Sequence, residues 1–257
     1  MGYALVTGAS KGIGKAIAEK LAAEKFDLIL VARSPELLGK VATGIRERFG
    51  VKADWLSLDL SVPGASQKVF DWCGEKGYSV QALVNNAGYG LSGPFEKYSA
   101  AENLDMMQVN MSALVHLTRL FLPQLHRQSK AYILNIASSA AYQAVPLLSL
   151  YSATKAFVLF FSRGLRQELA KSSVSVSCVC PGATDTDFPN RANIGEKGMK
   201  AASRLNMTPE AVAFLAVKGM LAGKGEIITG FVNKAGAFMA WLLPKTFVER
   251  TAMKIYE

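Results

Sequence analysis

Short apolar runs alternate along the chain with longer stretches in which apolar residues recur at helical spacing. The apolar runs predict strands at residues 3–6, 27–32, 53–58, 82–84, 132–137, 174–179 and 226–229. The stretches between them predict helices at about 16–22, 34–49, 64–76, 101–128, 149–170 and 208–221. Strands that alternate with helices in this way are typical of an α/β fold.

Length and composition favour one domain. The chain has 257 residues, of which 50% are hydrophobic, and this is enough for a single large core. No linker divides it, so we predict one domain over residues 1–257. Within it, residues 184–207 are polar and basic, with Arg191, Lys197, Lys200 and Arg204, and we interpret them as a lid over a substrate. Residues 231–257 form a tail beyond the last strand.

Charge and residue counts narrow the class of protein. The net charge of +9 admits an anionic partner, but the basic residues are dispersed, which argues against nucleic-acid binding. Residues 235–243 are apolar but too few to span a membrane. The three cysteines favour buried thiols over disulfides, and the two unclustered histidines indicate no metal site. The chain begins with a strand and not with a signal peptide, so we expect a cytoplasmic protein.

A glycine-rich turn follows the first predicted strand. Gly8, Gly12 and Gly14 allow a tight turn and a close approach to a pyrophosphate, whose charge the following helix N-terminus would meet. The alternative interpretation is an ordinary strand-to-helix turn that binds no phosphate. After the second strand stands Arg33, where a carboxylate would bind a free ribose hydroxyl and an arginine accommodates a 2′-phosphate. With Lys11 as a second cation, Arg33 favours NADP(H), although a solvated loop arginine is the alternative.

A phenol and an ammonium group stand four residues apart on a predicted helix, at Tyr151 and Lys155. This spacing places both on one face, where the cation would lower the pKa of the tyrosine and fit it for proton transfer. Ser138 follows a strand and would hold a carbonyl oxygen. Asp59, after the third strand, would accept from an adenine amino group, or Asp59 or Ser61 would cap a helix. A solvated helix face is the alternative for the Tyr–Lys pair.

Together the motifs Thr7-Gly-x-x-x-Gly-x-Gly14, Asn85-Asn-Ala-Gly88, Ser138, Tyr151-x-x-x-Lys155 and Pro181-Gly182 resemble the short-chain dehydrogenase/reductase family. The resemblance covers about residues 3–188. It implies a Rossmann-type, doubly wound parallel sheet of about seven strands in three αβα layers. It also implies hydride exchange between a nicotinamide cofactor and a carbonyl or alcohol, as in the NADP(H)-preferring ketone, 3-oxoacyl and hydroxysteroid reductases.

The resemblance further assigns roles to residues. The catalytic set would be Asn110, which holds a water of the proton relay, with Ser138, Tyr151 and Lys155; Ser138 is chosen over Ser139 because the family serine lies thirteen positions before the tyrosine. The cofactor would contact Gly8, Ser10, Lys11, Gly12, Ile13, Gly14, Arg33, Asp59, Leu60, Asn86, Ala87, Gly88, Tyr151, Lys155, Pro181, Gly182, Thr184 and Thr186. The helices at 101–128 and 149–170 would form the interface of a homodimer or homotetramer, with a buried core as the rival interpretation.

We therefore expect an NADP(H)-dependent oxidoreductase acting on an apolar small molecule. A regulator that senses NADP(H) without turnover would need only the glycine turn and Arg33, so the catalytic set argues against it. The short chain and the glycine spacing argue against a sugar-nucleotide epimerase or dehydratase. Three roles stay open for the tail. It could form a wall of the substrate pocket, form a subunit interface, or bind to a membrane surface, and the last is the least favoured.

Overall fold

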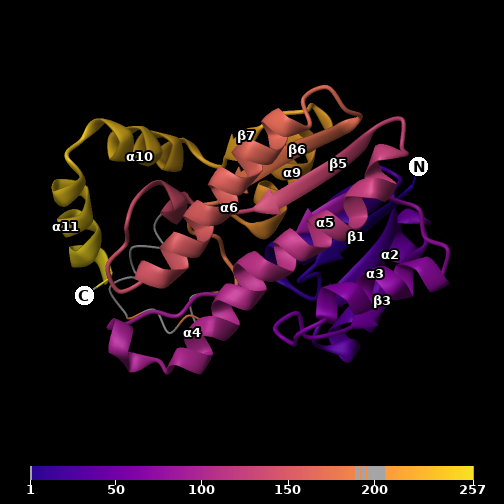
Figure 1. Cartoon of the computed structure of the whole chain (residues 1–257), viewed down its shortest axis with the longest axis horizontal. Coiled ribbons are helices and arrows are strands. Elements are labelled where there is room, and N and C mark those ends of the chain that lie inside the picture. The colour runs from indigo at the N-terminus through magenta and orange to yellow at the C-terminus, as the bar shows by residue number, and fades with distance from the viewer. Residues whose placement is uncertain (1, 189–191, 193–194, 196–198, 200–205, 257) are drawn as a thin grey trace.

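The strands form one parallel sheet at the centre of the molecule. The structure, a computed structural model, describes residues 2–188, 192, 195, 199 and 206–256. Within these residues seven strands pair in the order β3-β2-β1-β4-β5-β6-β7 (Figure 1). They are β1 (Tyr3–Thr7), β2 (Asp27–Ala32), β3 (Ala53–Ser57), β4 (Val80–Asn85), β5 (Ala131–Ile136), β6 (Val174–Cys180) and β7 (Glu226–Ile228). The order reverses between β1 and β4, and this opens a crevice at the carboxyl ends of the strands. The predicted Rossmann-type fold is confirmed.

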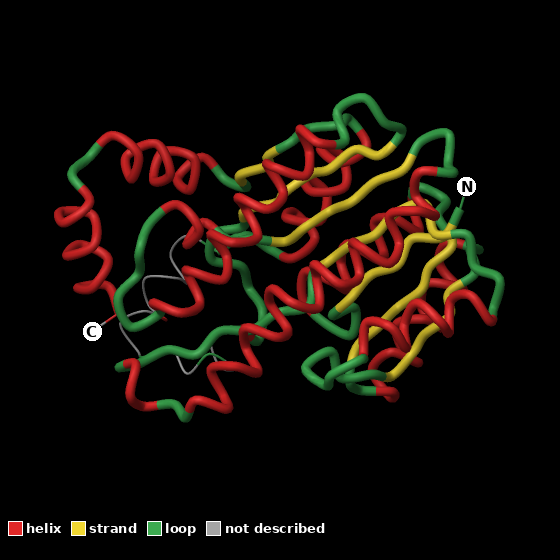
Figure 2. The backbone as a smooth tube through the Cα atoms, viewed as in Figure 1, coloured by secondary structure: helices red, strands yellow, loops and turns green. Residues whose placement is uncertain are grey.

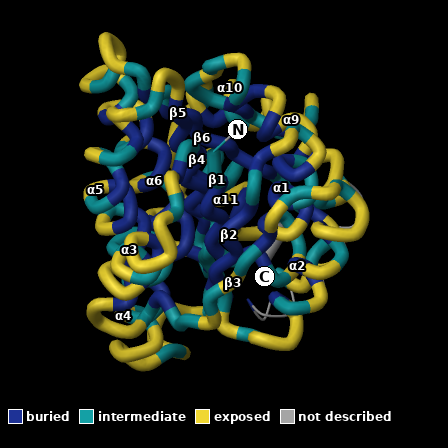
Figure 3. Tube along the Cα trace, turned by 90° about the vertical axis from the view of Figure 1, so that its right-hand side faces the viewer, coloured by how far each residue is buried: buried dark blue, intermediate teal, exposed yellow. Residues whose placement is uncertain are grey.

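Helices cover both faces of this sheet. The helices on the two faces are α1 (Gly12–Ala23), α2 (Pro35–Phe49), α3 (Ala65–Glu75), α5 (Ala113–His126), α6 (Ser149–Glu168) and α9 (Pro209–Leu221) (Figure 2). Helices α4 (Ala100–Met107), α10 (Phe231–Leu242) and α11 (Lys245–Tyr256) lie beyond the carboxyl ends of the strands (Figure 1). One apolar core lies between the sheet and α1, α2 and α9, and a second lies between the sheet and α3, α5 and α6. The inner strands are mostly buried, the edge strands β3 and β7 are partly exposed, and the outer sides of the helices are exposed (Figure 3). None of the described helices has the length and apolar character needed to cross a bilayer.

Local capping chemistry explains where several helices begin. The Ser34 hydroxyl accepts from the backbone N–H of Leu37 and Pro35 occupies the first turn, so α2 begins as predicted. The Thr208 hydroxyl accepts from the Ala211 N–H at 3.2 Å and starts α9 in the same way. Helix α3, in contrast, begins after Gly64, so the expectation that Asp59 or Ser61 caps it is wrong.

The predicted helix at 101–128 is not continuous. Between α4 and α5 the chain makes a π-helical turn, Gln108–Ser112, with the buried Asn110 at its centre. The side chain of Asn110 is bonded to the backbone of Tyr89 and to Thr154. A π turn admits one extra residue, and such turns occur at functional sites. Hydrophobic periodicity does not register a single added residue, so this turn could not be predicted from the apolar pattern.

A chain of buried amides fixes the helices on the sheet. Asn85 Nδ2 donates to Asn135 Oδ1 at 2.9 Å and to Thr118 Oγ1 at 3.2 Å, which joins β4, β5 and α5. Asn135 Nδ2 then donates to Ser162 Oγ at 2.9 Å, on α6. Buried hydrogen-bonded networks of this kind specify one arrangement of the elements around them. Helix α6 is therefore held in one position relative to the carboxyl ends of the strands.

The turn from β1 into α1 packs more closely than any side chain would allow. A Cβ added at Gly14 would lie 2.3 Å from the carbonyl oxygen of Gly8 and 2.4 Å from Nδ2 of Asn86. That Nδ2 donates to the carbonyl oxygens of Thr7 at 2.9 Å and Gly8 at 3.2 Å. The glycine therefore lets α1 begin directly against the end of β4, where the crevice opens.

We predict that Gly14→Ala lowers the free energy of unfolding by about 1–3 kcal/mol, because the methyl group forces backbone atoms apart. Gly39→Ala is the matched control: it lies in α2 with no atom within 4 Å of the added methyl, and it should raise stability by about 0.5–1 kcal/mol. Urea denaturation of both variants without ligand measures this. Equal stabilities for the two variants would show that the close contact is unimportant.

Candidate active site

A cavity of about 680 Å³ occupies the crevice at the carboxyl ends of the strands. Its lining includes every residue predicted to contact a cofactor, from Gly8 in the glycine turn to Thr186 after β6, together with Ser138. Of the predicted site residues, only Asn110 lies outside the lining. The fold thus brings together residues from the ends of six strands, β1 to β6, and their assigned roles stay predictions.

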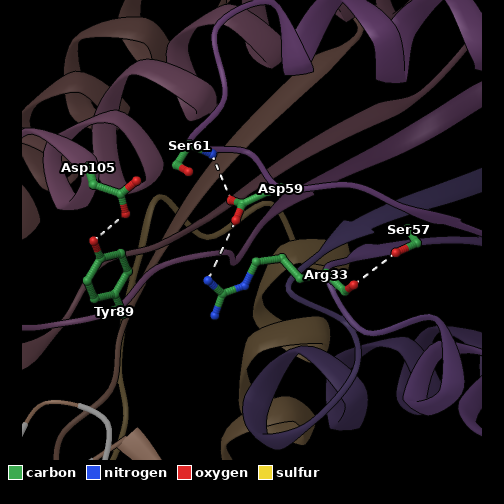
Figure 4. A network of polar contacts seen from close by, with 6 residues as sticks. All are labelled: Arg33, Ser57, Asp59, Ser61, Tyr89 and Asp105. Atoms are coloured by element: carbon green, nitrogen blue, oxygen red, sulfur yellow. Dashed lines mark hydrogen bonds and ion pairs between the residues drawn. The ribbon is translucent and has the colours of Figure 1, made fainter. Parts of the chain in front are cut away.

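At one end of the cavity, Arg33 and Asp59 form an ion pair (Figure 4). Nη1 of Arg33 lies 3.7 Å from Oδ2 of Asp59, and both side chains are more than a third exposed. The backbone N–H of Ser61 donates to Asp59 at 3.0 Å. Partial burial opposes ionisation of Asp59, but this hydrogen bond and the nearby arginine outweigh it and lower the pKa of the carboxyl. The two residues predicted to meet the adenosine end therefore contact each other here.

The loop after β6 reaches across the cavity to the glycine turn. Lys11 is hydrogen-bonded to Asp187. A Cβ at Gly12, whose φ is +57°, would lie 3.2 Å from the methyl group of Thr186. Asp187 was missed by the sequence analysis, because its only signal is its place two residues beyond Asp185 in a segment interpreted as a lid. Arg191, Lys197, Lys200 and Arg204 of that lid lie outside the described residues.

Lys155 is buried beneath the cavity floor. Its Nζ donates to the carbonyl oxygen of Ile136 at 2.9 Å and lies 5.8 Å from the centroid of the Tyr151 ring. Burial lowers the pKa of the Lys155 ammonium to about 8, and the thiols of Cys178 and Cys180 oppose that shift. Within the described residues no carboxylate forms an ion pair with it. The predicted placement of the phenol and the ammonium on one face of a helix is confirmed.

The two serines after β5 differ in their contacts. The Ser138 hydroxyl lines the cavity and accepts from the backbone N–H of Ala140 at 3.1 Å. Because the Ser138 hydroxyl is the acceptor in this hydrogen bond, its own proton can still be donated to a ligand. The backbone N–H of Ser139 instead donates to the carbonyl oxygen of Pro181 at 2.7 Å, joining the loops that follow β5 and β6.

Asn110 fixes the loop that follows β4. Its Nδ2 donates to the Tyr89 carbonyl at 2.9 Å and to Thr154 Oγ1 at 3.0 Å, and its Oδ1 accepts from the Tyr89 N–H at 3.0 Å. A Cβ at Gly88 would lie 3.0 Å from this Oδ1 and 3.3 Å from Nζ of Lys155. Both side-chain donors of Asn110 are thus used by the protein, and a water held by this residue stays a prediction.

Tyr89 itself anchors this loop to α4. Its hydroxyl donates to a carboxylate oxygen of Asp105 (Figure 4). The sequence analysis did not single out either residue, because an aromatic residue after Gly88 and an acid in a helix are both ordinary on their own. Their contact joins the β4 loop, which lines the cavity, to the helix that leads into the π turn.

Phe188 covers the face of Tyr151 and was also missed. The two ring centroids are 5.2 Å apart, with an angle of 48° between the planes. Gly90 makes room for them: an added Cβ would lie 2.9 Å from Phe188 Cζ and 3.2 Å from Tyr151 Cδ2. With Leu148, Phe188 gives this end of the cavity an apolar wall. The only available signal was a single aromatic residue at the start of a polar segment.

The tail contacts the cavity wall at Gly182 but does not itself line the cavity in the described residues. The side chain of Asn233 fills the space where Gly182 has no Cβ, and its Nδ2 donates to the Thr229 carbonyl at 2.7 Å. No described residue from 231 to 256 lines the cavity. Phe238, Trp241 and Leu242 are exposed, so the interpretation of these three as a wall of the substrate pocket is wrong for this arrangement.

Comparisons with known proteins agree with this geometry. Residues 2–197 match the family model described as short chain dehydrogenase. The very-long-chain 3-oxoacyl-CoA reductase-B of Danio rerio is 39% identical over 184 residues, which are 70% of this chain and 58% of that protein. A ketoacyl reductase of Nostoc, HetN, is 32% identical over 231 residues, 87% of this chain and 77% of that protein. A short-chain dehydrogenase from Sphingobium yanoikuyae, solved with NADPH, superposes with a TM-score of 0.82 at 31% identity, over 94% of this chain and 95% of that one.

The chain therefore belongs to the short-chain dehydrogenase family. The resemblance of its motifs to this family is confirmed. The chain spans 58% of the length of the Danio rerio relative.

We predict that Lys155→Met changes how stability depends on pH. The pKa of Lys155 falls from 10.5 to about 8 on folding, so between these values the unfolded chain holds the proton and the folded chain releases it. Deprotonation of Lys155 removes a buried charge from the folded chain, so stability should rise with pH. Between pH 7 and pH 10 the unfolding free energy of wild type should increase by about 2–3 kcal/mol more than that of the Met variant. Denaturant titrations at both pH values measure the gain. The exposed Lys171→Met should show no such change, and parallel pH profiles for the Lys155 variant and wild type would contradict the prediction.

Proposed function

We propose that this protein is an NADP(H)-dependent oxidoreductase that interconverts a carbonyl and an alcohol on an apolar small molecule. The observation that carries the proposal is the pairing of Tyr151 with the buried Lys155 at the floor of a cavity that also contains the glycine turn. A sensor of the cofactor would have no need to bury an ammonium beside a phenol, because burial of a charge is unfavourable. The names of the relatives, which are reductases and a dehydrogenase, support the same class.

The residues present fit a dinucleotide. The glycine turn lines the cavity with its backbone and packs so closely that a Cβ at Gly8 or Gly14 would meet atoms of the turn or of the β4 loop. It leads into the N-terminus of α1, where backbone N–H groups favour an anion. Arg33 lies at the end of the cavity where a 2′-phosphate would be met, and Asp59 and Leu60 lie beside it. We infer that Pro181, Gly182 and Thr184 line the opposite, nicotinamide end. NADP(H) would supply or accept the hydride.

The chain's own residues would handle the proton. In the reductive direction, the hydroxyl of Ser138 donates to the carbonyl oxygen of the substrate and the phenol of Tyr151 transfers its proton to that oxygen. The ammonium of Lys155 favours the phenolate that remains. Since the pKa of Lys155 is about 8, this support weakens as the pH rises above that value.

The apolar wall of the cavity suggests the class of substrate. Phe188 and Leu148 stand on the Tyr151 side, and neither offers a polar group to a ligand. We infer a ketone or an oxoacyl group on an apolar body, in keeping with the oxoacyl and ketoacyl substrates in the names of two relatives. A panel of carbonyl compounds with NADPH tests this choice.

We also infer that residues 1–257 act as one domain in the cytoplasm and associate as a homodimer or homotetramer. The inferred association is supported by an exposed aromatic strip on α6: Phe160 is 66% and Phe157 is 40% exposed, and the Phe157 ring stacks on Phe161. Large apolar side chains on one helix face are typical of a subunit interface. Light scattering of the purified chain distinguishes these states from a monomer.

We predict that Tyr151→Phe lowers kcat by at least about a hundredfold while NADPH affinity stays within a few-fold of wild type, because the change removes the transferable proton and little volume. Steady-state kinetics and fluorescence titration with NADPH measure the two quantities. Tyr132→Phe is the control, since Tyr132 is buried in β5 away from the cavity. Activity of the Tyr151 variant within tenfold of wild type would exclude the proposed acid.

We predict a preference for NADPH over NADH of roughly tenfold to a hundredfold in kcat/KM, because a charge-assisted contact with the 2′-phosphate contributes about 1.5–3 kcal/mol. Arg33→Gln should abolish most of this preference by weakening NADPH and leaving NADH unchanged. Arg48→Gln removes an exposed arginine of α2 that does not line the cavity, and it should change neither value. The same preference in the Arg33 variant would show that another residue selects the cofactor.

A further inference from the structure

Helix α10 presents two unlike faces. Its inner face packs on the turn Ser139–Tyr142 and carries the buried Ala240 and the half-buried Asn233. Its outer face carries Phe231, Phe238 and Leu242, which recur at helical spacing and lie along one line of the helix. Trp241 and Met239 flank that line. We call these five residues the apolar tail face.

The apolar tail face is exposed to an unusual degree. Phe231 is 84%, Trp241 is 73% and Phe238 is 58% exposed, and the rings of Phe238 and Trp241 lie 5.9 Å apart. Scattered apolar side chains are normal on a protein surface, but a contiguous set on one helix indicates a binding surface. A partner that covers this face is therefore expected.

The charge around this face indicates what the partner is. The tail, residues 231–257, contains four basic side chains, Lys234, Lys245, Arg250 and Lys254, and two acidic side chains, Glu249 and Glu257, so its net charge is 4 − 2 = +2. Lys234 stands on the flank of the apolar tail face, and Arg250 and Lys254 are exposed on α11. Aromatic side chains beside exposed cations match the boundary of a bilayer with anionic headgroups, where the rings enter the acyl region and the cations meet the phosphates.

A second copy of the chain fits this face less well. Helix α10 has 12 residues, so its outer face measures roughly 18 Å by 10 Å, or about 200 Å². A stable interface needs about 800 Å² on each partner. A two-fold contact between two tails would also bring like charges together. The same length, about 18 Å against a hydrocarbon core of about 30 Å, suits a helix that lies along a bilayer.

We propose that the apolar tail face of α10 binds to the surface of an anionic lipid bilayer, with the basic residues of α10 and α11 at the headgroups. Asn233 seats the start of α10 against Gly182, which lines the cavity. Helix α10 therefore connects the proposed bilayer-binding face to a loop that lines the cavity. The binding itself does not depend on the proposed oxidoreductase activity.

Co-sedimentation of the full chain with vesicles tests the proposal. The chain should bind vesicles that contain phosphatidylglycerol, bind pure phosphatidylcholine vesicles at least fivefold more weakly, and be released by high salt. Phe238→Ser with Trp241→Ser should weaken binding by about tenfold or more. Phe95→Ser is the matched control, because Phe95 is 68% exposed and lies far from the tail in the chain; it should bind as wild type does.

The charge contribution is tested separately. Lys234→Gln with Lys254→Gln should weaken binding to phosphatidylglycerol vesicles roughly fivefold for each charge removed, whereas Lys40→Gln with Lys68→Gln, two exposed lysines of α2 and α3, should not. Tryptophan fluorescence should shift to the blue on vesicle binding, and Trp241→Phe should remove the shift.

Circular dichroism and NADPH titration establish that the variants are folded, so a loss of binding is not a loss of structure. Equal binding to the two kinds of vesicle, or no effect of the Phe238 and Trp241 changes, would overturn the proposal. If wild type binds no vesicles and the same two changes halve the mass in light scattering, the occupant is a second copy and the proposal is wrong.

Discussion

The buried ammonium group of Lys155 is the constraint on which the rest of the site depends. A cation without a carboxylate partner in the described structure is unfavourable in an apolar core, and it persists only where neighbouring polar atoms are held firmly. The Ile136 carbonyl at the end of β5 supplies one such atom. It stays in place because the amide chain from Asn85 through Asn135 to Ser162 joins β4, β5 and α6. The network in the middle of the sheet thus fixes the surroundings of Lys155 at its edge.

The same edge is closed by contacts between loops that are far apart in the sequence. Asn86 after β4 donates to the end of β1, and Ser139 after β5 donates to Pro181 after β6. Each contact joins strands that are neighbours in the sheet, and β1 and β4 are not consecutive in the chain. Because α10 starts against Gly182, the tail is tied to this set of loops.

Features encoded by local chemistry could be predicted from the sequence, and features made by tertiary contact could not. The strands, the Ser34 cap of α2, the glycine turn and the shared helix face of Tyr151 and Lys155 follow from spacing within a few residues. The π turn at Asn110, the Phe188 ring on Tyr151 and the tie between Lys11 and Asp187 each depend on a partner distant in the chain. The tail shows the same limit: its apolar residues were visible, but which side of α10 faces the protein depends on Asn233 meeting a glycine.

The two ends of the cavity differ in exposure and in how their side chains are held. At the adenosine end, Arg33 and Asp59 are exposed and 3.7 Å apart. An exposed pair of this kind contributes about 0–1 kcal/mol, so a phosphate can draw Arg33 away at little cost. At the opposite end, Tyr151 and Lys155 are buried, and they contact Phe188 and the backbone of β5. The charged end of a ligand would therefore bind at the exposed Arg33–Asp59 pair, whose side chains can move. Its reacting end would lie beside the buried Tyr151 and Lys155, because proton transfer requires fixed geometry and ion pairing at a surface does not.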